Sequence, residues 1–528
     1  MANAITNHPS KLSLTVAVAA VLVAVPWLNP FAAPPISTVQ PALIFVSSVA
    51  ILVGLVAAAP ITRKGLWNAA CLAWVAAPLL NTVLALMQYF GVADSFDPWV
   101  NTASLGEAYG NLRQRNLFAS SCAIGLAVMV WHVDCRPSSH AFTLGGLLKR
   151  LGLGLAVVAL SVGLAVSMSR TGMAELILLW MLVWLWRRNE QASSNDHFEK
   201  RHLLTIGTAT YFAASWLLPK LSGHEGSSIT RLIKGDELCV SRLLIWKNMW
   251  QIAMQKPLLG WGWGEVPYAQ FMTLVEGPRS CEYLDNAHNL PLHLAVTLGF
   301  PLACLVFALT CWVVIRAQPW QAKEPVQRVA WAILALIGVH SLLEFPLWYG
   351  QFQFAFLISA WYLHSYRGQG RRSENWLYAA VMSSPKARIA TLALVPAVLW
   401  ICNVVWDSYY RIHLVYLPEN LRPAEYAKGF QLKSRDVLLF VNEASFARLH
   451  MELNPGNAQD SLEIACNLLH ANVSPIAIEK IIASLNLLGR PREAQYYEIR
   501  YQAAFPKQYA NWVANGRTSK FFQTNASQ

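Results

Sequence analysis

The sequence contains few charged residues for its length. Only 13% of its 528 residues are Asp, Glu, Lys or Arg, whereas soluble globular proteins carry roughly 25%. Hydrocarbon penalises charge, and a surface that faces lipid must be apolar. Together with a hydrophobic content of 55% and 22 Trp residues, which concentrate at membrane interfaces, this deficit excludes an ordinary soluble domain and predicts an integral membrane protein.

Several motifs for cofactors and nucleic acids are also missing. The sequence has no C-x-x-C or H-E-x-x-H pattern and no Asp-x-Asp-like element, so we expect no metal and no other cofactor. The net charge is +12, but it forms no arginine-rich stripe. A membrane protein collects Lys and Arg in its cytoplasmic loops, so the charge does not predict a nucleic-acid partner.

Long apolar runs predict an all-α fold, a polytopic membrane helix bundle with about eleven spans. A span needs about 20 apolar residues. The first run is expected to be an uncleaved first span rather than a signal peptide. The predicted spans are residues 12–31, 41–60, 66–90, 116–133, 151–168, 172–186, 202–219, 289–315, 326–343, 346–366 and 388–406.

The connections between these runs differ in charge. Alternate connections are rich in Lys and Arg, as in Arg63-Lys64, Arg187-Arg188 and Arg371-Arg372. The short connections between them hold only Arg113, Arg115 and Arg170. Because cytoplasmic loops are enriched in Lys and Arg, we predict a cytoplasmic N-terminus and a C-terminal region on the outer face. For a bacterium this means the inner membrane, with the periplasm on the outer side.

Two polar segments interrupt the predicted bundle. We predict four parts: a membrane bundle at 1–219, a large periplasmic loop at 220–288, a second membrane bundle at 289–406, and a periplasmic helical, repeat-like domain at 407–528. In the last part, helix-spaced apolar positions occur at 438–451, 458–471 and 474–488. Cys239 and Cys281 share the large loop, and an oxidising compartment permits a disulfide between them.

Polar residues gather at the outer ends of the predicted spans in four clusters. These are residues 111–116, residues 167–172, the stretch from Ser241 to Asn289, and residues 340–349. Taken singly, each has a plain explanation. An interfacial Arg such as Arg170 commonly contacts lipid head groups, His288 fits a solvated loop, and Glu344 fits a helix cap. Their shared face is what points to a common site.

A common site would have a definite chemistry. Arg113, Arg115, Arg170 and Arg242 would form a cationic patch that suits a lipid pyrophosphate, because Arg binds phosphate oxygens with two parallel hydrogen bonds. His288 and Glu344 add groups for proton transfer. Trp and Tyr offer faces for sugar rings.

The order and spacing of these motifs resemble the O-antigen ligase and polymerase superfamily of bacterial membrane enzymes. More narrowly, they look like the pilin-glycosylating protein O-oligosaccharyltransferases. A Gln-Pro-Asn-like element matches Gln114-Arg115-Asn116, with Arg115 where Pro is usual. Phe345 replaces a Tyr in the Glu-Tyr-Pro-Leu-Trp-Tyr element, so no role is carried onto position 345. The other matches are Ser169–Gly172; Arg242, Trp246, Pro257, Gly260, Gly262 and Gly264; His288, Asn289 and Leu292; and Glu344–Tyr349.

The resemblance implies a reaction and roles for these residues. An oligosaccharide would move en bloc from undecaprenyl pyrophosphate to a Ser or Thr hydroxyl of a periplasmic protein such as pilin. His288 would be the base, with Glu344 second. Arg170 and Arg242, supported by Arg113 and Arg115, would stabilise the leaving pyrophosphate. The substrate-binding residues would be Gln114, Asn116, Asn289, Trp348 and Tyr349.

Other functions stay open at this point. An O-antigen polymerase or ligase shares most of the motifs but transfers to a glycan or a lipid A core. A transporter or flippase would place polar groups near the bilayer midplane on broken helices, whereas here they gather at one face. A sensor or scaffold would use the outer tail as a receptor module, which leaves the clustered Arg, His and Gln residues without a role.

Overall fold

The computed structural model describes residues 14–59, 61–132, 144–187, 194–223, 241–281, 283–367, 384–417, 421–424, 439–449 and 453–517. Every regular element in these ranges is an α-helix or a 3-10 turn, as the all-α prediction requires. The chain divides into two compact units. Unit 1 comprises Met1–Gly235 with Val313–Val404, and unit 2 comprises Asp236–Trp312 with Val405–Gln528.

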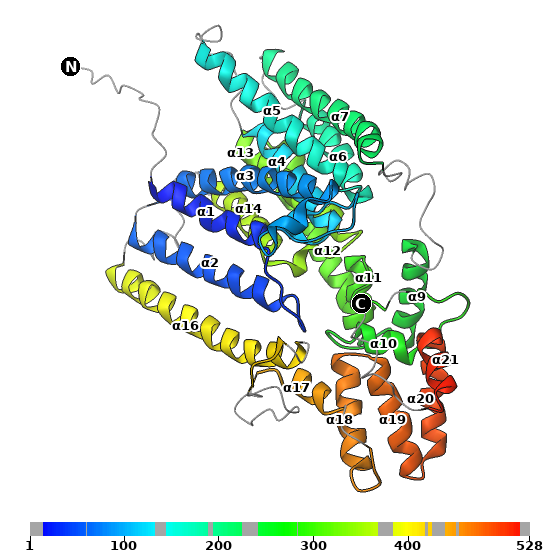
Figure 1. Ribbon diagram of the computed structural model, residues 1–528. Coiled ribbons are helices and arrows are strands. Elements are labelled where there is room, and N and C mark those ends of the chain that lie inside the picture. The colour runs from blue at the N-terminus through cyan, green and yellow to red at the C-terminus, as the bar shows by residue number, and fades with distance from the viewer. Residues whose placement is uncertain are drawn as a thin grey trace, which may run out of the picture. The chain divides into compact units, whose positions relative to one another are not determined.

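Unit 1 is a bundle of long apolar helices (Figure 1). Helices α12 (Phe300–Ala317) and α16 (Pro385–Tyr416) contain the points at which the chain passes between the units. The other described α-helices of unit 1 are α1 (Leu14–Leu28), α2 (Val39–Ala58), α3 (Arg63–Tyr89), α4 (Arg115–Trp131), α5 (Leu144–Val166), α6 (Arg170–Trp186), α7 (Ser194–Ser222), α13 (Pro325–Ser341) and α14 (Gly350–Arg367).

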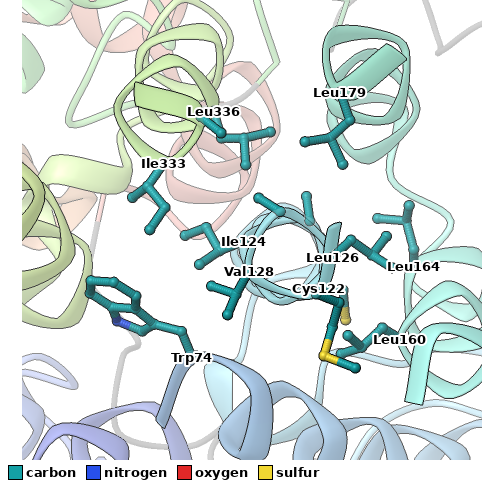
Figure 2. Packing of buried hydrophobic residues seen from close by; sticks show 14 of the residues in the cluster. Trp74, Cys122, Ile124, Leu126, Val128, Leu160, Leu164, Leu179, Ile333 and Leu336 are labelled. Atoms are coloured by element: carbon teal, nitrogen blue, oxygen red, sulfur yellow. The ribbon is translucent and has the colours of Figure 1, made fainter. Parts of the chain in front are cut away.

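Helix α4 is the central helix of unit 1. Every residue from Leu117 to Trp131 is buried, which is the mark of a helix that is apolar on all sides. Figure 2 shows its side chains Ile124 and Leu126 surrounded by residues of four other helices. These neighbours are Trp74 of α3, Leu160 and Leu164 of α5, Leu179 of α6, and Ile333 and Leu336 of α13.

Small residues allow α6 to approach α4 closely. A Cβ atom built on Gly172 would lie 2.8 Å from the Cβ of Ala119 on α4 and 2.7 Å from Cδ1 of Leu164. No larger residue fits at that position without a shift of the neighbours. This is a physical reason for the glycine of the Ser-Arg-Thr-Gly motif, because small residues let helix backbones pack tightly in membranes.

Most of the described residues in each predicted span are helical. Four described segments are long and apolar enough to cross a membrane by themselves: Val39–Ala58, Arg63–Tyr89, Phe300–Gln321 and Pro385–Leu414. Leu14–Leu28, Arg115–Trp131 and Arg150–Val166 are shorter apolar helices. The chain is therefore a helical membrane protein, and the number of about eleven crossings stays a prediction.

One predicted span is divided. The run 289–315 was expected to be a single helix, but α11 (Leu290–Leu298) ends at Gly299, and α12 begins at Phe300. Gly299 has φ +81°, and a Cβ there would lie 2.3 Å from the carbonyl oxygen of Leu258. The close approach of a second backbone segment thus requires glycine and interrupts the helix.

Unit 2 joins the large polar loop to the C-terminal tail. Its remaining helices are α9 (Arg242–Gln255), α10 (Val266–Met272), α17 (Val441–Arg448), α18 (Ala458–Ala471), α19 (Pro475–Leu487), α20 (Pro491–Ala504) and α21 (Pro506–Ala514). Phe271 of α10 is fully buried in the same apolar core as Leu468 of α18 and Ile478 of α19. The loop and the tail are therefore one packed structure, although about 170 residues of sequence separate their helices.

The tail is helical, as the apolar spacing predicts. Helices α18 to α21 follow one another as antiparallel neighbours (Figure 1). Pro475, Pro491 and Pro506 each stand at the start of a helix, where the fixed φ of proline is favourable. Cys281 is disulfide-bonded. Its predicted partner, Cys239, lies outside the described residues, so the pairing stays a prediction.

Candidate active site

The first part of the site is the N-terminal end of the central helix. Arg113 adopts the left-handed conformation at φ +59°, and Gln114 is extended at φ −141° before α4 begins at Arg115. This abrupt turn places Gln114 at the N-cap and Asn116 in the first turn of a helix that is buried from Leu117 onward. Their side chains are held by a residue from a distant part of the chain.

That residue is Glu344, in the turn that follows α13. Its side chain is almost completely buried, with 2% exposed. Gln114 Nε2 donates a hydrogen bond to one carboxylate oxygen at 3.3 Å, and Asn116 Nδ2 donates to the other at 3.0 Å. Both oxygens of the carboxylate are therefore engaged, which satisfies a charge that would otherwise be costly to bury.

Ser169 links a third motif to this pair. Its hydroxyl donates to Asn116 Oδ1 at 2.6 Å and accepts a hydrogen bond from the backbone N–H of Gly172 at 3.1 Å. The second bond makes Ser169 the N-cap of α6, as is common for serine. Arg170 is the first residue of that helix. We refer to Gln114, Asn116, Ser169 and Glu344 as the amide–carboxylate network.

Two of the predicted phosphate-binding arginines already have partners within the protein. Arg115 forms an ion pair with Glu107. Arg113 is half-buried, and burial lowers the pKa of its guanidinium, while the nearby Tyr349 opposes that shift. Nη2 of Arg113 also donates to the backbone carbonyl of Asn29 at 3.4 Å. The guanidinium groups are thus positioned at the loop that leads into α4.

Aromatic side chains follow Glu344. Phe345 and Tyr349 stack with ring centroids 6.0 Å apart and an interplanar angle of 23°. Trp348 ends a short 3-10 turn, Pro346–Trp348, and is 42% exposed. An exposed Trp beside a buried carboxylate offers a flat apolar face of the kind that contacts sugar rings.

A second polar cluster lies deeper between the same helices. His340 belongs to the predicted cluster 340–349, but its partners Ser120 and Glu175 were not predicted. Ser120 of α4 donates to Glu175 Oε1 of α6, and its hydroxyl lies 2.7 Å from His340 Nδ1 of α13. All three side chains are buried. Glu175 Oε2 and His340 Nε2 have no hydrogen-bond partner among the described residues. The sequence could have indicated this cluster, because Glu175 is a carboxyl group within the apolar run 172–186, where such groups are unusual.

The loop before α4 is held in place by buried amides. Gln88 of α3 accepts hydrogen bonds from the backbone N–H groups of Tyr109 and Gly110 at 3.0 and 2.8 Å. Asn81 accepts one from the backbone N–H of Asn111 at 2.9 Å. These bonds satisfy backbone groups that would otherwise be buried without partners, and they fix the segment that leads to Arg113.

In unit 2, His288 lies two residues before the first residue of α11. It has φ +47°, and its backbone N–H donates to Asn286 Oδ1 at 2.9 Å. The indole N–H of Trp246 donates to the His288 carbonyl at 3.3 Å. Asn289, a predicted substrate-binding residue, caps α11 by accepting from the backbone N–H of Leu292 at 3.0 Å. The backbone on both sides of His288 is therefore well constrained.

Arg242 is the first residue of α9, with Ser241 as its N-cap. It stands four residues, or about one helical turn, before Trp246. The glycine-rich segment that follows has a steric basis, because a Cβ on Gly260 would lie 2.4 Å from the carbonyl carbon of Thr297. Thus the Arg-Trp-glycine motif and the His288 motif meet within unit 2.

Unusual backbone conformations mark these motifs. Five non-glycine residues in the described ranges have positive φ: Arg113, Met168, His288, Gln318 and Arg517. The first three lie within or beside the predicted site motifs. Such conformations cost of order 1–3 kcal/mol each and cluster at functional sites. They are an indication of function independent of the residue types.

The structure brings part of the predicted site together. Gln114, Asn116 and Glu344 are joined in unit 1, and Ser169 ties Arg170 to them. Arg242, His288 and Asn289 belong to unit 2. Their predicted convergence with the amide–carboxylate network stays a prediction.

Three family models match this chain. A protein glycosylation ligase model matches residues 108–131, which include Gln114 and Asn116. An O-antigen ligase model matches residues 155–307, which include Arg170, Arg242 and His288. A model described as virulence factor membrane-bound polymerase, C-terminal, matches residues 328–520, which include Glu344 and the tail.

Two characterised proteins of Acinetobacter baylyi are similar to it. A general O-oligosaccharyltransferase is 23% identical over 292 residues, which cover 52% of this chain and 47% of that protein. A ComP-specific O-oligosaccharyltransferase is 29% identical over 126 residues, 24% of this chain and 22% of that protein. The matched stretch thus spans about half the length of the first relative. These matches confirm the resemblance to O-oligosaccharyltransferases of the O-antigen ligase superfamily.

Proposed function

We propose that this relative of the O-oligosaccharyltransferases transfers an oligosaccharide en bloc from undecaprenyl pyrophosphate to Ser or Thr hydroxyls of periplasmic proteins such as pilin. The observation that carries the proposal is the amide–carboxylate network. It joins three motifs, from residues 114–116, 169–172 and 344–349, through side-chain hydrogen bonds in one unit. Structural stability alone does not call for a buried carboxylate held by two amides at the end of the central helix.

The proposed chemistry is a displacement at the anomeric carbon of the first sugar. The acceptor oxygen forms a new bond to that carbon, and the bond from the carbon to the pyrophosphate oxygen breaks. The electron pair of the broken bond leaves with undecaprenyl pyrophosphate. The proton of the acceptor hydroxyl passes to a base on the enzyme, because a neutral hydroxyl is a weak nucleophile.

We assign the base to His288. Histidine is the side chain that most often serves as a general acid or base in enzymes. Glu344 is the second candidate, but both of its oxygens already accept hydrogen bonds from amides. Its proposed role is therefore to orient Gln114 and Asn116 toward the pyrophosphate or the first sugar.

Arginines are assigned to the leaving group. Negative charge builds up on the pyrophosphate as the bond breaks, and fixed cations that meet this charge stabilise the transition state. Arg170 and Arg242 are the main candidates, each at the first position of a helix. A helix N-terminus adds its own attraction for anions. Arg113 and Arg115 would support them, and Trp348 and Tyr349 would contact the glycan or the acceptor.

A second function is favoured by the matches to the O-antigen ligase and polymerase models. Transfer to a growing glycan or to a lipid A core uses the same donor and differs only in the acceptor. Because both functions use the same donor, the residues proposed to bind the donor do not distinguish them, and the acceptor must be tested.

The test is a reconstitution with alternative acceptors. The purified protein in proteoliposomes receives a polyprenyl-pyrophosphate oligosaccharide together with a pilin, or with lipid A core. Mass spectrometry follows the acceptor. We expect the mass of one complete oligosaccharide to appear on a pilin Ser or Thr. Transfer to lipid A core or to glycan, with the pilin left unmodified, would refute the protein acceptor.

A further inference from the structure

The outward face of α9 is apolar. Leu243, Trp250 and Met254 are exposed and recur at positions i, i+7 and i+11, with Lys247 between them at i+4. At 3.6 residues per turn these four side chains lie along one stripe of the helix. A helix on a water-exposed surface should instead present polar residues there.

The opposite face of α9 is also apolar but is already covered. Ile245, Met249 and Ile252 are fully buried in a core that includes Val296 of α11. The exposed stripe is therefore not the face that holds α9 to its unit. A helix that is apolar on both faces is expected to have a second apolar environment.

The turn after α9 extends this apolar surface. Leu258 and Leu259 are 71% and 86% exposed. The turn is nevertheless firmly fixed, because the backbone N–H of Phe300 donates to the Pro257 carbonyl at 2.8 Å and that of Trp261 donates to the Val296 carbonyl at 2.8 Å. Two exposed leucines on a rigid turn are costly in water and point to a partner.

The surface is continuous with a membrane helix. Phe300 is the first residue of α12, which opens the candidate membrane span Phe300–Gln321. The ring centroids of Trp250 on α9 and Phe300 lie 5.2 Å apart. Because Phe300 marks the end of a span, the apolar stripe begins where hydrocarbon gives way to head groups. Trp is enriched at that boundary, and the long side chain of Lys can extend its charge to the head groups there.

We propose that residues 243–263 form an interfacial element that inserts into the surface of the lipid bilayer at the N-terminal end of α12. Leu243, Trp250, Met254, Leu258 and Leu259 enter the boundary between head groups and acyl chains. Such elements bury their apolar face about 5–10 Å into that region. Lys247 and Lys256 meet anionic head groups at its edge.

Insertion of this element into the bilayer would fix the position of His288. Helix α9 packs against α11, and Trp246 is bonded to the His288 carbonyl. Anchoring α9 on the bilayer therefore sets the height of His288 above the membrane. This inference rests on the membrane span and the exposed stripe, and it holds whether or not His288 is the base.

The test places a fluorine probe on the turn. Trifluoromethyl-phenylalanine replaces Leu259 in the full-length protein, which is incorporated into nanodiscs of phosphatidylethanolamine and phosphatidylglycerol. One sample contains lipid with a nitroxide near the head group, and another contains a water-soluble gadolinium chelate. A matched control carries the same probe at Glu463, an exposed position on α18 outside residues 243–263.

At position 259 we expect the lipid nitroxide to broaden the fluorine line about twofold or more, since an interfacial side chain is buried about 5–10 Å into the region of the bilayer that carries the label. The gadolinium chelate should leave that line sharp and broaden the line at position 463. Broadening of both lines by the chelate would overturn the proposal. A line at position 259 that neither agent broadens would also overturn it, because another part of the chain or a second copy would then cover the turn.

Discussion

Asn116 donates a hydrogen bond from Nδ2 to Oε1 of Glu344 at 3.0 Å, although 228 positions separate the two residues in the sequence. The other oxygen of Glu344 accepts a hydrogen bond from Gln114. Glutamine at position 344 would have one acceptor oxygen for two donors, so one amide would face an NH₂ group. The carboxylate is therefore required for the geometry as well as for its charge.

For Glu344→Gln we expect the rate of oligosaccharide transfer to fall about 10- to 100-fold, since a hydrogen bond to a charged group contributes roughly 1.5–3 kcal/mol. The measurement is the initial rate of oligosaccharide transfer in proteoliposomes, normalised to the amount of inserted protein. Glu463→Gln, on an exposed part of α18, is the control and should transfer normally. A normal rate for Glu344→Gln would remove the network from the mechanism.

The buried cluster around Ser120 should contribute to stability. Ser120→Ala leaves Glu175 and His340 buried without their common partner, which we expect to cost about 1–3 kcal/mol. Thermal unfolding in detergent measures the loss. Ser121→Ala is a matched control, because Ser121 is equally buried and donates to the carbonyl of Phe118 in its own helix at 2.7 Å. Equal thermal unfolding midpoints for the two variants would show that the hydrogen bonds of Ser120 do not stabilise the protein.

The positions of the helices could be predicted because a bilayer forces the backbone to satisfy its hydrogen bonds internally. Each apolar run therefore became helix. The break at Gly299 was missed because apolar composition continues through it, although the sequence Gly299-Phe300-Pro301 is a recognisable interruption.

The site was predictable only as a set of residues on one face. Charge asymmetry predicts that Asn116 and Glu344 lie on the same side of the membrane, but their contact depends on how α4 and α13 are rotated, which the sequence does not encode locally. Ser169 was identified through its motif, yet its bond to Asn116 arises from the close packing that Gly172 permits.

The shared core of loop and tail predicts that one substitution will loosen both. Phe271→Ala removes a fully buried ring from the core that contains Ile478, and such changes cost about 3–5 kcal/mol. Hydrogen exchange should then accelerate in α10 and in α18–α19 together. Val513→Ala, at an exposed position, should leave exchange unchanged. Faster exchange confined to α10 would show that the tail folds independently.

The charge asymmetry of the connections predicts an outer location for the end of α16 and the tail. A reporter enzyme that is active only after export, fused after residue 410, should be active in whole cells. A second reporter that is active only in the cytoplasm should be inactive at the same position. The reverse pattern would refute the predicted orientation and the periplasmic location of the site.

Protein glycosylation that depends on His288 is the most direct test of the proposed function. A strain lacking the gene is complemented with the wild-type protein, with His288→Ala, or with His202→Ala as a control at an exposed position on α7. Mass spectrometry of periplasmic and pilus proteins then measures intact oligosaccharide on Ser and Thr. Loss of a general base typically lowers rates by about 10²–10⁴-fold. We expect glycosylated protein with the wild type and His202→Ala and none with His288→Ala at equal membrane abundance, whereas full glycosylation with His288→Ala, or its persistence without the gene, would contradict the proposed function.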